Sequence, residues 1–464
     1  MKTKLSMIGA VVAAAIASQA QAFGPTTVPD VTIFIAGGSA QAPAAIVFAQ
    51  KLLQAGADQY TDQTNCTAGA NYRAIFGTGL ASLPASLANK KILIEYANNG
   101  GTFKNGIDGL VRAHQVDYQT FLNNSTACPG GSAAQFAVTN VNTKENHVPV
   151  VGFSDEEIGL FTGVNLPAGN AAITQTDINA SGTSSSGIYE NVFGVALTSA
   201  LAAQKTNFTK AEVTAIYSGA YSDWSQLTDA SGNPLPAGAI TIIDRSPGSG
   251  SKAAFNQYFL ANPGASAAGG ALSPANVSGG FGNCGAPATS GSGAYSTTVY
   301  SDCPQSSNGN VKNGLNNANA AGVRAIGVLG MEFQPVAGTD HYQFASLDGV
   351  TVSGTTTKTC GNAVANPFEP ANVVSGAYDF FFTNGIQFRT KSLNGAPFQG
   401  DGTAQSAFIT AYVAAAQDPA TEVSVPGVLL DPAVVGGPSG AAYDACITKG
   451  TRNGNSTQEV QLQF

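Results

Sequence analysis

One stretch of the chain, residues 240–255, carries residue types that could bind an anion. An apolar, β-branched run predicts a buried strand that ends at Arg245, and a Ser-Pro-Gly-Ser-Gly-Ser segment then leads to a helix predicted over residues 252–260. The first backbone N–H groups of a helix have no partner within the helix, and the helix dipole is positive there. A strand that turns through glycine and serine into a helix therefore predicts an anion-binding loop.

The side chains of this loop suit the same chemistry. Gly248 and Gly250 let the backbone approach a ligand closely. Ser249 and Ser251 offer hydroxyl donors, and Arg245 offers a rigid fork of donors with a permanent positive charge.

Three other interpretations of this stretch compete with an anion-binding loop. A Walker loop would have glycine immediately before Lys252, but that residue is serine. A nucleophilic serine would be expected in a Gly-x-Ser-x-Gly segment, which the stretch does not contain. An ordinary helix capped by serine stays open on the stretch alone, since serine is common at that position.

Two further strand–loop–helix units precede this stretch. Residues 31–36 predict a strand, followed by Gly37-Gly38-Ser39 and a helix predicted over residues 42–55. Residues 91–96 predict a strand that leads through a polar, glycine-rich joint to a helical pattern ending near His114. Each unit could hold an anion at the start of its helix, and each could also be an ordinary loop.

A carboxylate stands at the end of another predicted strand. Residues 148–153 lead into Asp155, which could be a site residue or a helix N-cap. The alternation of strands and helices predicts an α/β fold with mainly parallel sheets. In such sheets ligands bind beyond the carboxyl ends of the strands, which is where all of these loops lie.

The remainder of the chain continues this alternation. Further strands are predicted over residues 191–197, 325–329 and 378–388, and further helices over residues 209–216, 311–320 and 404–416. Residues 261–308 and 350–373 are rich in small and polar residues and predict long loops.

The first 22 residues predict a cleaved signal for export. Lys2 and Lys4 precede an apolar run that is too short to span a membrane, and Ala20-Gln-Ala22 is a small-residue cleavage site. No cysteine follows that site and no later stretch is apolar enough to span a membrane, so neither a lipid anchor nor membrane insertion is expected. We expect a soluble protein that is periplasmic or secreted.

The chain is acidic and poor in charge. Charged residues make up 10% of it, and loss of Lys2 and Lys4 with the signal takes the formal charge from −8 to −10. Such a chain is poorly suited to bind nucleic acid or anionic lipid, which argues against both classes of partner.

Six cysteines in an exported chain predict three disulfides. The sequence leaves the pairing open, and we expect neighbours to pair: Cys66 with Cys128, Cys284 with Cys303, and Cys360 with Cys446. No pair has the Cys-x-x-Cys spacing of a zinc site, and the three histidines, His114, His147 and His341, are scattered along the chain. We therefore expect neither a metal nor another cofactor.

Several segments, in chain order, resemble the substrate-binding proteins of bacterial phosphate ABC transporters. Residues 152–155 (GFSD) are similar to the GxSD motif of that family, and residues 216–227 (IYSGAYSDWSQL) to its IFxGxIxxWxxL motif. Residues 245–251 (RSPGSGS), followed by Phe255 and Tyr258, resemble its RxDGSGT loop. Residues 308–311 match its next helix start, and residues 325–333 (AIGVLGMEF) resemble its AIGYVEYxY strand.

The resemblance implies a periplasmic-binding-protein-like fold of type II. Its two lobes would each be a mainly parallel sheet flanked by helices, joined by a hinge of two crossovers. One lobe would comprise residues 23–196 plus 377–464. The other would comprise residues 197–376, with loop insertions pinned by disulfides.

The resemblance also implies a phosphate cage. Asp155 would accept the proton of a monohydrogen phosphate, and Arg245 would supply the positive charge. The implied donors are Ser39 in the first loop, Asn99, Gly100, Gly101 or Thr102 in the second, and Ser249, Gly250 and Ser251 in the other lobe.

Two features depart from the family. The aspartate that anchors the family's phosphate-binding arginine is replaced here by Pro247, and whether Asp244 takes over that role is open. The chain also carries extra loops and cysteines.

The first functional hypothesis is an exported, monomeric protein that binds phosphate or a related oxyanion, with an ABC transporter permease as a partner and no enzymatic activity. An exported phosphate-ester hydrolase on the same scaffold stays open as an alternative. A surface protein that has lost the ligand is a third.

Overall fold

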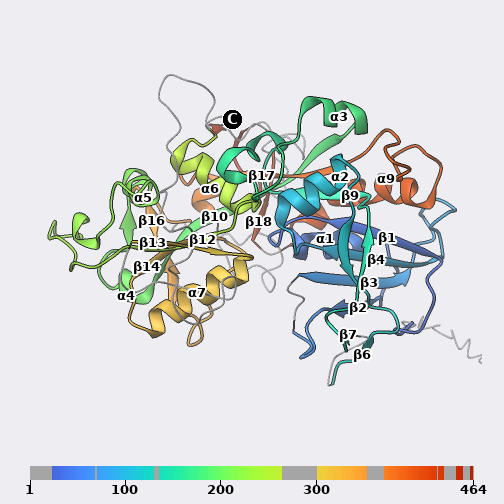
Figure 1. The fold of residues 1–464 in the computed structure, drawn as a ribbon, viewed down its shortest axis with the longest axis horizontal. Helices are drawn as coiled ribbons and strands as arrows, with labels where there is room; N and C mark the ends of the chain where they lie inside the picture. The colour runs from blue at the N-terminus through green and yellow to red at the C-terminus, as the bar shows by residue number, and fades with distance from the viewer. Residues whose placement is uncertain are drawn as a thin grey trace, which may run out of the picture.

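The chain forms two lobes that lie side by side (Figure 1). The computed structural model describes residues 23–67, 71–129, 135–263, 300–352, 370–425, 427–432, 446–452 and 460–462. The first lobe, on the right of Figure 1, is built around β1 (Val31–Ala36), and the second, on the left, around β12 (Thr241–Arg245). Strands β10 (Ser184–Thr198) and β17 (Phe381–Phe388) lie between them.

The first lobe has three parallel strands at its centre. Strand β1 pairs in parallel with β4 (Lys91–Ala97) and β9 (Val151–Ser154), so their carboxyl ends point the same way. The sheet continues through β3 (Tyr72–Thr78), β2 (Asp58–Thr61), β7 (Gln135–Val138) and β6 (Ser125–Ala127). Helices α1 (Ala42–Gln50) and α9 (Ala404–Ala416) bury Phe48, Phe408 and Tyr412 against one face.

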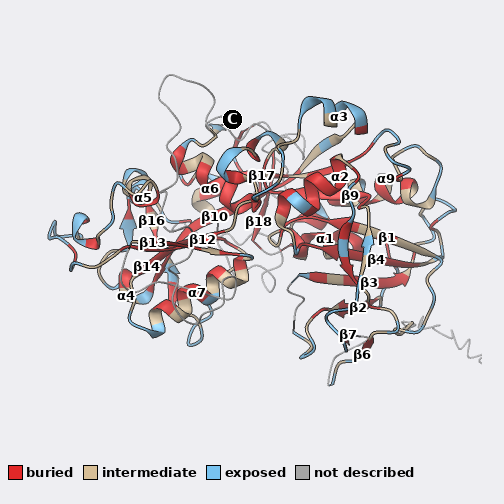
Figure 2. Ribbon diagram, viewed as in Figure 1, coloured by how far each residue is buried: buried red, intermediate tan, exposed pale blue. Residues whose placement is uncertain are grey.

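The second lobe repeats the parallel arrangement with a different order. Strand β12 lies between β13 (Ser301–Gln305) and β14 (Ala325–Gly330), and both pairs are parallel. Helices α5 (Lys210–Tyr217) and α6 (Gly250–Leu260) lie on one side of these strands, and α7 (Asn308–Ala320) lies on the other (Figure 1). Many residues of the strands at the centre of both lobes are buried (Figure 2).

The two lobes share one continuous sheet through β10 and β17. Strand β10 pairs antiparallel with β17 along one part of its length and with β14 along another, and β17 in turn pairs antiparallel with β9. The chain crosses between the lobes here. The two-lobe α/β fold is thus confirmed, with parallel strands at the centre of each lobe and antiparallel strands where the lobes join. The residue boundaries of the lobes stay a prediction.

The remaining elements are short. They are β5 (Val116–Gln119), β8 (Lys144–His147), β11 (Asn207–Phe208), β15 (Tyr342–Phe344), β16 (Ser346–Leu347), β18 (Val428–Leu430), β19 (Gly450–Thr451), β20 (Gln461–Leu462), α2 (Gly109–Val111), α3 (Gln175–Ser181), α4 (Ser199–Ala202), α8 (Ala371–Val374), α10 (Pro419–Glu422), the π-helix η1 (Thr102–Asp108), and the 3-10 helices η2 (Ile158–Leu160), η3 (Gly163–Asn165) and η4 (Trp224–Gln226).

Some elements differ from the sequence prediction. Helix α1 ends at Gln50, short of residue 55, because Leu53 bridges to Gly79 instead. The helical pattern that ends near His114 forms a π-helix before α2. Strand β13 lies in a stretch predicted as loop, because its sequence, Ser-Asp-Cys-Pro-Gln, has no apolar alternation.

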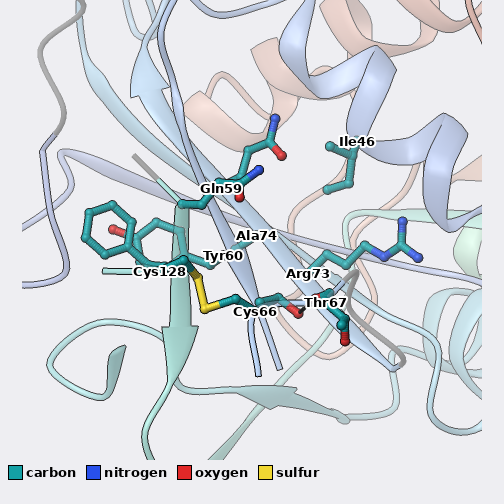
Figure 3. Close-up of a pocket in the computed structure, with 11 residues that line it drawn as sticks. Ile46, Gln59, Tyr60, Cys66, Thr67, Arg73, Ala74 and Cys128 are labelled. Carbon is teal, nitrogen blue, oxygen red and sulfur yellow. Dashed lines mark hydrogen bonds between the residues drawn. A yellow bond between two sulfur atoms is a disulfide. The ribbon is translucent and has the colours of Figure 1, made fainter. Parts of the chain in front are cut away.

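One predicted disulfide is confirmed. Cys66 and Cys128 are bonded beside β2 and β7 (Figure 3). Cys303 and Cys446 are disulfide-bonded as well, but the partners predicted for them, Cys284 and Cys360, lie outside the described residues. The predicted export signal, residues 1–22, also lies outside them. Within the described ranges, no helix is long and apolar enough to cross a membrane.

A buried carboxyl group on α10 makes the stability of the fold depend on pH. Burial raises the pKa of Glu422 to about 9, and the neighbouring carboxylates of Asp431, Asp418 and Glu190 act in the same direction. Neither carboxyl oxygen of Glu422 has a hydrogen-bond partner among the described residues. Between about pH 4.5 and about pH 9, Glu422 therefore keeps its proton in the folded state and loses it in the unfolded state.

We expect Glu422→Gln to stabilise the protein at alkaline pH. Because the folded-state pKa is raised, the contribution of Glu422 to stability is complete below about pH 4.5 and is lost progressively as the pH rises towards about 9. Glutamine stays neutral throughout. Urea midpoints at about pH 5 and about pH 9 should therefore differ between the two proteins mainly at the higher pH. An equal difference at both values would contradict this account.

Candidate anion-binding site

Asp155 lies where the strand-end loops of the two lobes meet. It follows β9 and is 1% exposed. Its Oδ1 accepts hydrogen bonds from Gln41 Nε2 and, at 3.0 Å, from Thr102 Oγ1, both in the first lobe. Its Oδ2 lies 3.4 Å from Ser251 Oγ in the second lobe. The carboxylate is therefore held from both sides, and it does not cap a helix, since the next helical turn begins at Ile158.

The first turn of α6 completes this arrangement. Gly250 N donates to Thr102 Oγ1 at 3.1 Å, so a backbone donor of the second lobe meets a hydroxyl of the first. A Cβ atom at Gly250 would lie 2.3 Å from Asp155 Cγ, so only glycine allows this approach. We call Gln41, Thr102, Asp155, Arg245, Gly250 and Ser251 the cage.

The lobes also touch beside the cage. Phe103 N donates to Gly248 O at 2.9 Å, and Gly248 N donates to Asn165 O at 2.9 Å. Apolar side chains continue the contact, because Ala253 of α6 joins the buried cluster that contains Phe103. The structure therefore shows the two lobes in the closed arrangement.

Arg245 is anchored by an amide and by backbone carbonyls. Its Nη1 donates to Asn308 Oδ1, and its Nε and Nη2 lie 3.3 Å from the carbonyl oxygens of Gln305 and Ser306. Asn308 Oδ1 also lies 3.5 Å from Ser251 Oγ, which links Arg245 to the cage hydroxyl.

In this chain, where Pro247 stands at the aspartate position, Asn308 and two backbone carbonyls hold the guanidinium of Arg245. Among the described contacts, Asp244 makes no hydrogen bond to the guanidinium: Asp244 Oδ2 pairs with Lys252 Nζ, and Asp244 Oδ1 accepts from the backbone N of Arg245. Neighbouring residues of a strand point to opposite faces, so Asp244 faces away from the arginine side chain.

Burial is the largest influence on the pKa values of Asp155 and Arg245 in the cage. Burial raises the pKa of Asp155, while Gln41, Thr102 and Arg245 oppose that rise. Burial lowers the pKa of Arg245 to about 10, opposed by Asp155, Asp244 and Glu332. The guanidinium therefore keeps its charge at neutral pH, and it faces a carboxylate that is costly to ionise without a partner.

The resemblance also implies Ser39, Gly101 and Ser249 as ligand-binding residues. Ser39 Oγ is buried and has no hydrogen-bond partner in the described chain, next to Gly38, whose own Cβ would lie 2.3 Å from Thr102 Oγ1. Gly101, with φ of +73°, precedes Thr102, and a Cβ there would lie 3.1 Å from Gly248 O. Ser249 acts as the N-cap of α6, accepting from Lys252 N at 3.4 Å.

Asn99 takes another position. Its Oδ1 accepts from Asn105 Nδ2 at 2.8 Å, and the residue lines a polar cavity of about 420 Å³ together with Asp62, Tyr72 and Lys144. Of the second-loop residues implied by the resemblance, Thr102 is the one whose side chain reaches Asp155.

Three polar residues of this region were not identified from the sequence. Gln41 and Asn308 contact cage residues directly, and Glu332 Oε1 accepts from Asn308 Nδ2 at 3.1 Å. Each follows the carboxyl end of a strand, β1, β13 or β14, which is the signal that identified Asp155.

A separate cavity of about 250 Å³ lies beside the Cys66–Cys128 disulfide, lined by Gln59, Tyr60 and Arg73 (Figure 3). None of the cage residues lines it. Among the described residues, no group of three or more His, Cys, Asp or Glu side chains could hold a metal ion.

Residues 191–397 match a family model described as the PBP superfamily domain. The matched segment runs from β10 to a point beyond β17, so it includes Arg245, Gly250 and Ser251, whereas Gln41, Thr102 and Asp155 precede it. No curated protein matches the chain.

Several solved structures are similar to most of the chain at low identity. A putative phosphate ABC transporter substrate-binding protein from Clostridium perfringens, solved with bound phosphate, is 13% identical, with 84% of this chain and 95% of that chain covered and a TM-score of 0.41. A phosphate-binding protein from Stenotrophomonas maltophilia is 16% identical, with coverage of 82% and 89% and a TM-score of 0.36. PstS from Borrelia burgdorferi is 11% identical, with coverage of 85% and 95% and a TM-score of 0.35.

Proposed function

We propose that this protein binds phosphate or a related oxyanion between its two lobes. The observation that carries the proposal is the convergence on Asp155 of hydroxyl donors from both lobes, with the charge of Arg245 close by. A carboxylate accepts hydrogen bonds only, whereas the hydroxyls and the guanidinium donate. A ligand that fits this set must accept several hydrogen bonds and also donate one, which describes a partly protonated oxyanion.

The donors have distinct roles in this proposal. Arg245 supplies a charge-assisted hydrogen bond, and Gly250 N at the start of α6 supplies a backbone donor at the positive end of a helix. Thr102, Ser251 and the unpartnered hydroxyl of Ser39 supply neutral donors. We propose Asn99, Gly101 and Ser249 as further ligand-binding residues of the loops. Fixed donors act over a few ångströms, so the acidic net charge of the chain does not prevent anion binding.

Movement of the lobes admits the ligand. We place the boundaries at residues 23–196 plus 377–464 for one lobe and 197–376 for the other, with the crossovers at β10 and β17 as the hinge. We further propose export, a monomeric state and delivery of the ligand to an ABC transporter permease. Binding without catalysis is favoured because His114 and His147 pair with Asp108 and Glu145 rather than with cage residues.

Phosphate should raise the melting temperature of the protein. A ligand that binds only the folded state stabilises it, by about 2.7 kcal/mol at a hundred times its Kd. Thermal unfolding would be followed with and without millimolar phosphate at constant ionic strength, with chloride as the control anion. An unchanged melting temperature at saturating phosphate would contradict the proposed function and favour a surface protein without this ligand.

Arg245→Ala should weaken phosphate binding by at least about tenfold. Hydrogen bonds to charged groups contribute about 1.5–3 kcal/mol, and 1.4 kcal/mol corresponds to a factor of ten. Calorimetric titration measures the change. Arg324→Ala is the matched control, because Arg324 also binds backbone carbonyls in the second lobe, those of Pro236 and Ala237, but does not contact the cage. Equal affinity in Arg245→Ala and wild type would exclude Arg245 as a ligand.

Asp155→Asn should reduce the preference for phosphate over sulfate. Asp155 can accept the proton of phosphate, but it opposes sulfate, which has no proton to donate. A site built for a ligand's donor rejects an analogue that lacks it, because a buried acceptor then stays unpaired at a cost of about 1–3 kcal/mol. The asparagine amide can donate to a fully ionised oxyanion. Competition binding should show the phosphate-to-sulfate ratio falling by about tenfold or more; an unchanged ratio would remove Asp155 from the ligand set.

A further inference from the structure

Glu332 is a second acidic residue beside the cage. It follows β14, and its Oε1 accepts from Asn308 Nδ2 at 3.1 Å. Its other oxygen, Oε2, is buried and has no hydrogen-bond partner among the described residues. A Cβ atom on Gly330 would lie 2.0 Å from that oxygen, which shows how closely the backbone packs against it.

Glu332 acts on Arg245 through Asn308. The amide of asparagine has donors on its nitrogen and an acceptor on its oxygen. Because Asn308 Nδ2 donates to Glu332, Asn308 Oδ1 faces Arg245 Nη1 and lies 3.5 Å from Ser251 Oγ. Glu332 is therefore a positioning residue for the guanidinium as well as a nearby charge.

The ionisable groups around Glu332 do not balance its charge. The charged groups that act on the pKa of Glu332 are Asp155 and Arg245, and Glu332 in turn raises the pKa of Tyr189 on β10 and of Tyr342 on β15. The guanidinium of Arg245 is thus shared between the carboxyl groups of Asp155 and Glu332. Burial raises the pKa of Glu332 to about 7, and Asp155 acts in the same direction; the backbone N–H of Glu332 itself, Asn308 and Arg245 oppose the rise.

We propose that Glu332 makes oxyanion binding at the cage dependent on pH: its neutral form permits tight binding, and its ionised form weakens it. This inference rests on the proposed function. An ionised Glu332 competes with the anionic ligand for the positive charge of Arg245, and it also repels the ligand. A bound anion therefore favours the protonated carboxyl group of Glu332. By linkage, ligand binding then takes up a proton, and affinity falls as the pH rises through neutrality.

Phosphate titrations between about pH 5.5 and about pH 8.5 test the proposal. The proteins are wild type, Glu332→Gln and Glu332→Ala. Phosphate itself changes protonation in this range, but it does so equally for each protein, so the ratio of dissociation constants isolates Glu332. Glutamine keeps an oxygen that can accept from Asn308 and removes the charge, whereas alanine removes both. Glu422→Gln is the matched control, because Glu422 is also a buried glutamate but its charged neighbours are Asp431, Asp418 and Glu190.

The expected result separates charge from positioning. Glu332→Gln should match wild type at the lowest pH and bind phosphate about tenfold more tightly than wild type at the highest, which corresponds to a shift of one pKa unit in Glu332 on binding. Glu332→Ala should lose affinity at every pH, since Asn308 is released. Glu422→Gln should keep the wild-type profile. Calorimetry in two buffers of different ionisation enthalpy should show proton uptake near neutrality that Glu332→Gln lacks.

Two different failures can be distinguished. If wild type binds phosphate tightly and Glu332→Gln has a parallel pH profile, the inference is wrong and the proposed function stands. If wild type binds no phosphate at any pH, the proposed function is wrong and the inference falls with it.

Discussion

The buried carboxylate of Asp155 is the point on which the closed arrangement depends. A carboxylate without partners in an apolar interior would be costly, so it must be met by donors. Those donors come from two directions: Thr102 and Gln41 from the first lobe, and Ser251 from the second. The backbone N of Gly250 connects the donors of the two lobes by donating to Thr102 Oγ1. The absence of a side chain on Gly250 leaves room for the carboxylate. Satisfying one buried charge therefore requires the strand-end loops of both lobes to meet.

The positive charge beside Asp155 is available because successive side chains of strand β12 point to opposite faces of the sheet. Its last two residues, Asp244 and Arg245, point to opposite faces, and each has its own partner. Lys252, on the first turn of α6, is buried with Asp244 and lies 3.9 Å from Asp302, so its charge is used within the second lobe. Arg245 is held by an amide and carbonyls, which do not neutralise it. The guanidinium thereby remains available to the cage, and Glu332 is close enough to modulate it.

Much of the fold could be predicted from local pattern, and less of the site. The apolar runs that end at Ala36, Phe153 and Arg245 identified the strands and the loops after them, and α9 has the predicted bounds. Strand β10 is longer than predicted because its first residues, Ser184 to Gly187, are polar and are placed by pairing with β17. The anchor of Arg245 could not be predicted, because Asn308 lies 63 residues further along the chain and only the parallel pairing of β12 with β13 brings the two together. Similarly, the register of the second loop depends on the π-helix that starts at Thr102, which no periodicity indicates.

Gln41 connects the cage to the strands between the lobes. Its Nε2 donates to Asp155 Oδ1 and also, at 2.8 Å, to Asn384 Oδ1 on β17, while its Oε1 accepts from Gly38 N. The amide therefore has a fixed orientation, since its oxygen is held by the loop that contains Ser39 and its nitrogen is shared between the carboxylate and the connecting strand. Asn384 is fully buried, so it follows any movement of β17. Gln41 and Asn384 both belong to the proposed first lobe, so this contact fixes Asp155 on that lobe, while Ser251 and Gly250 approach it from the other.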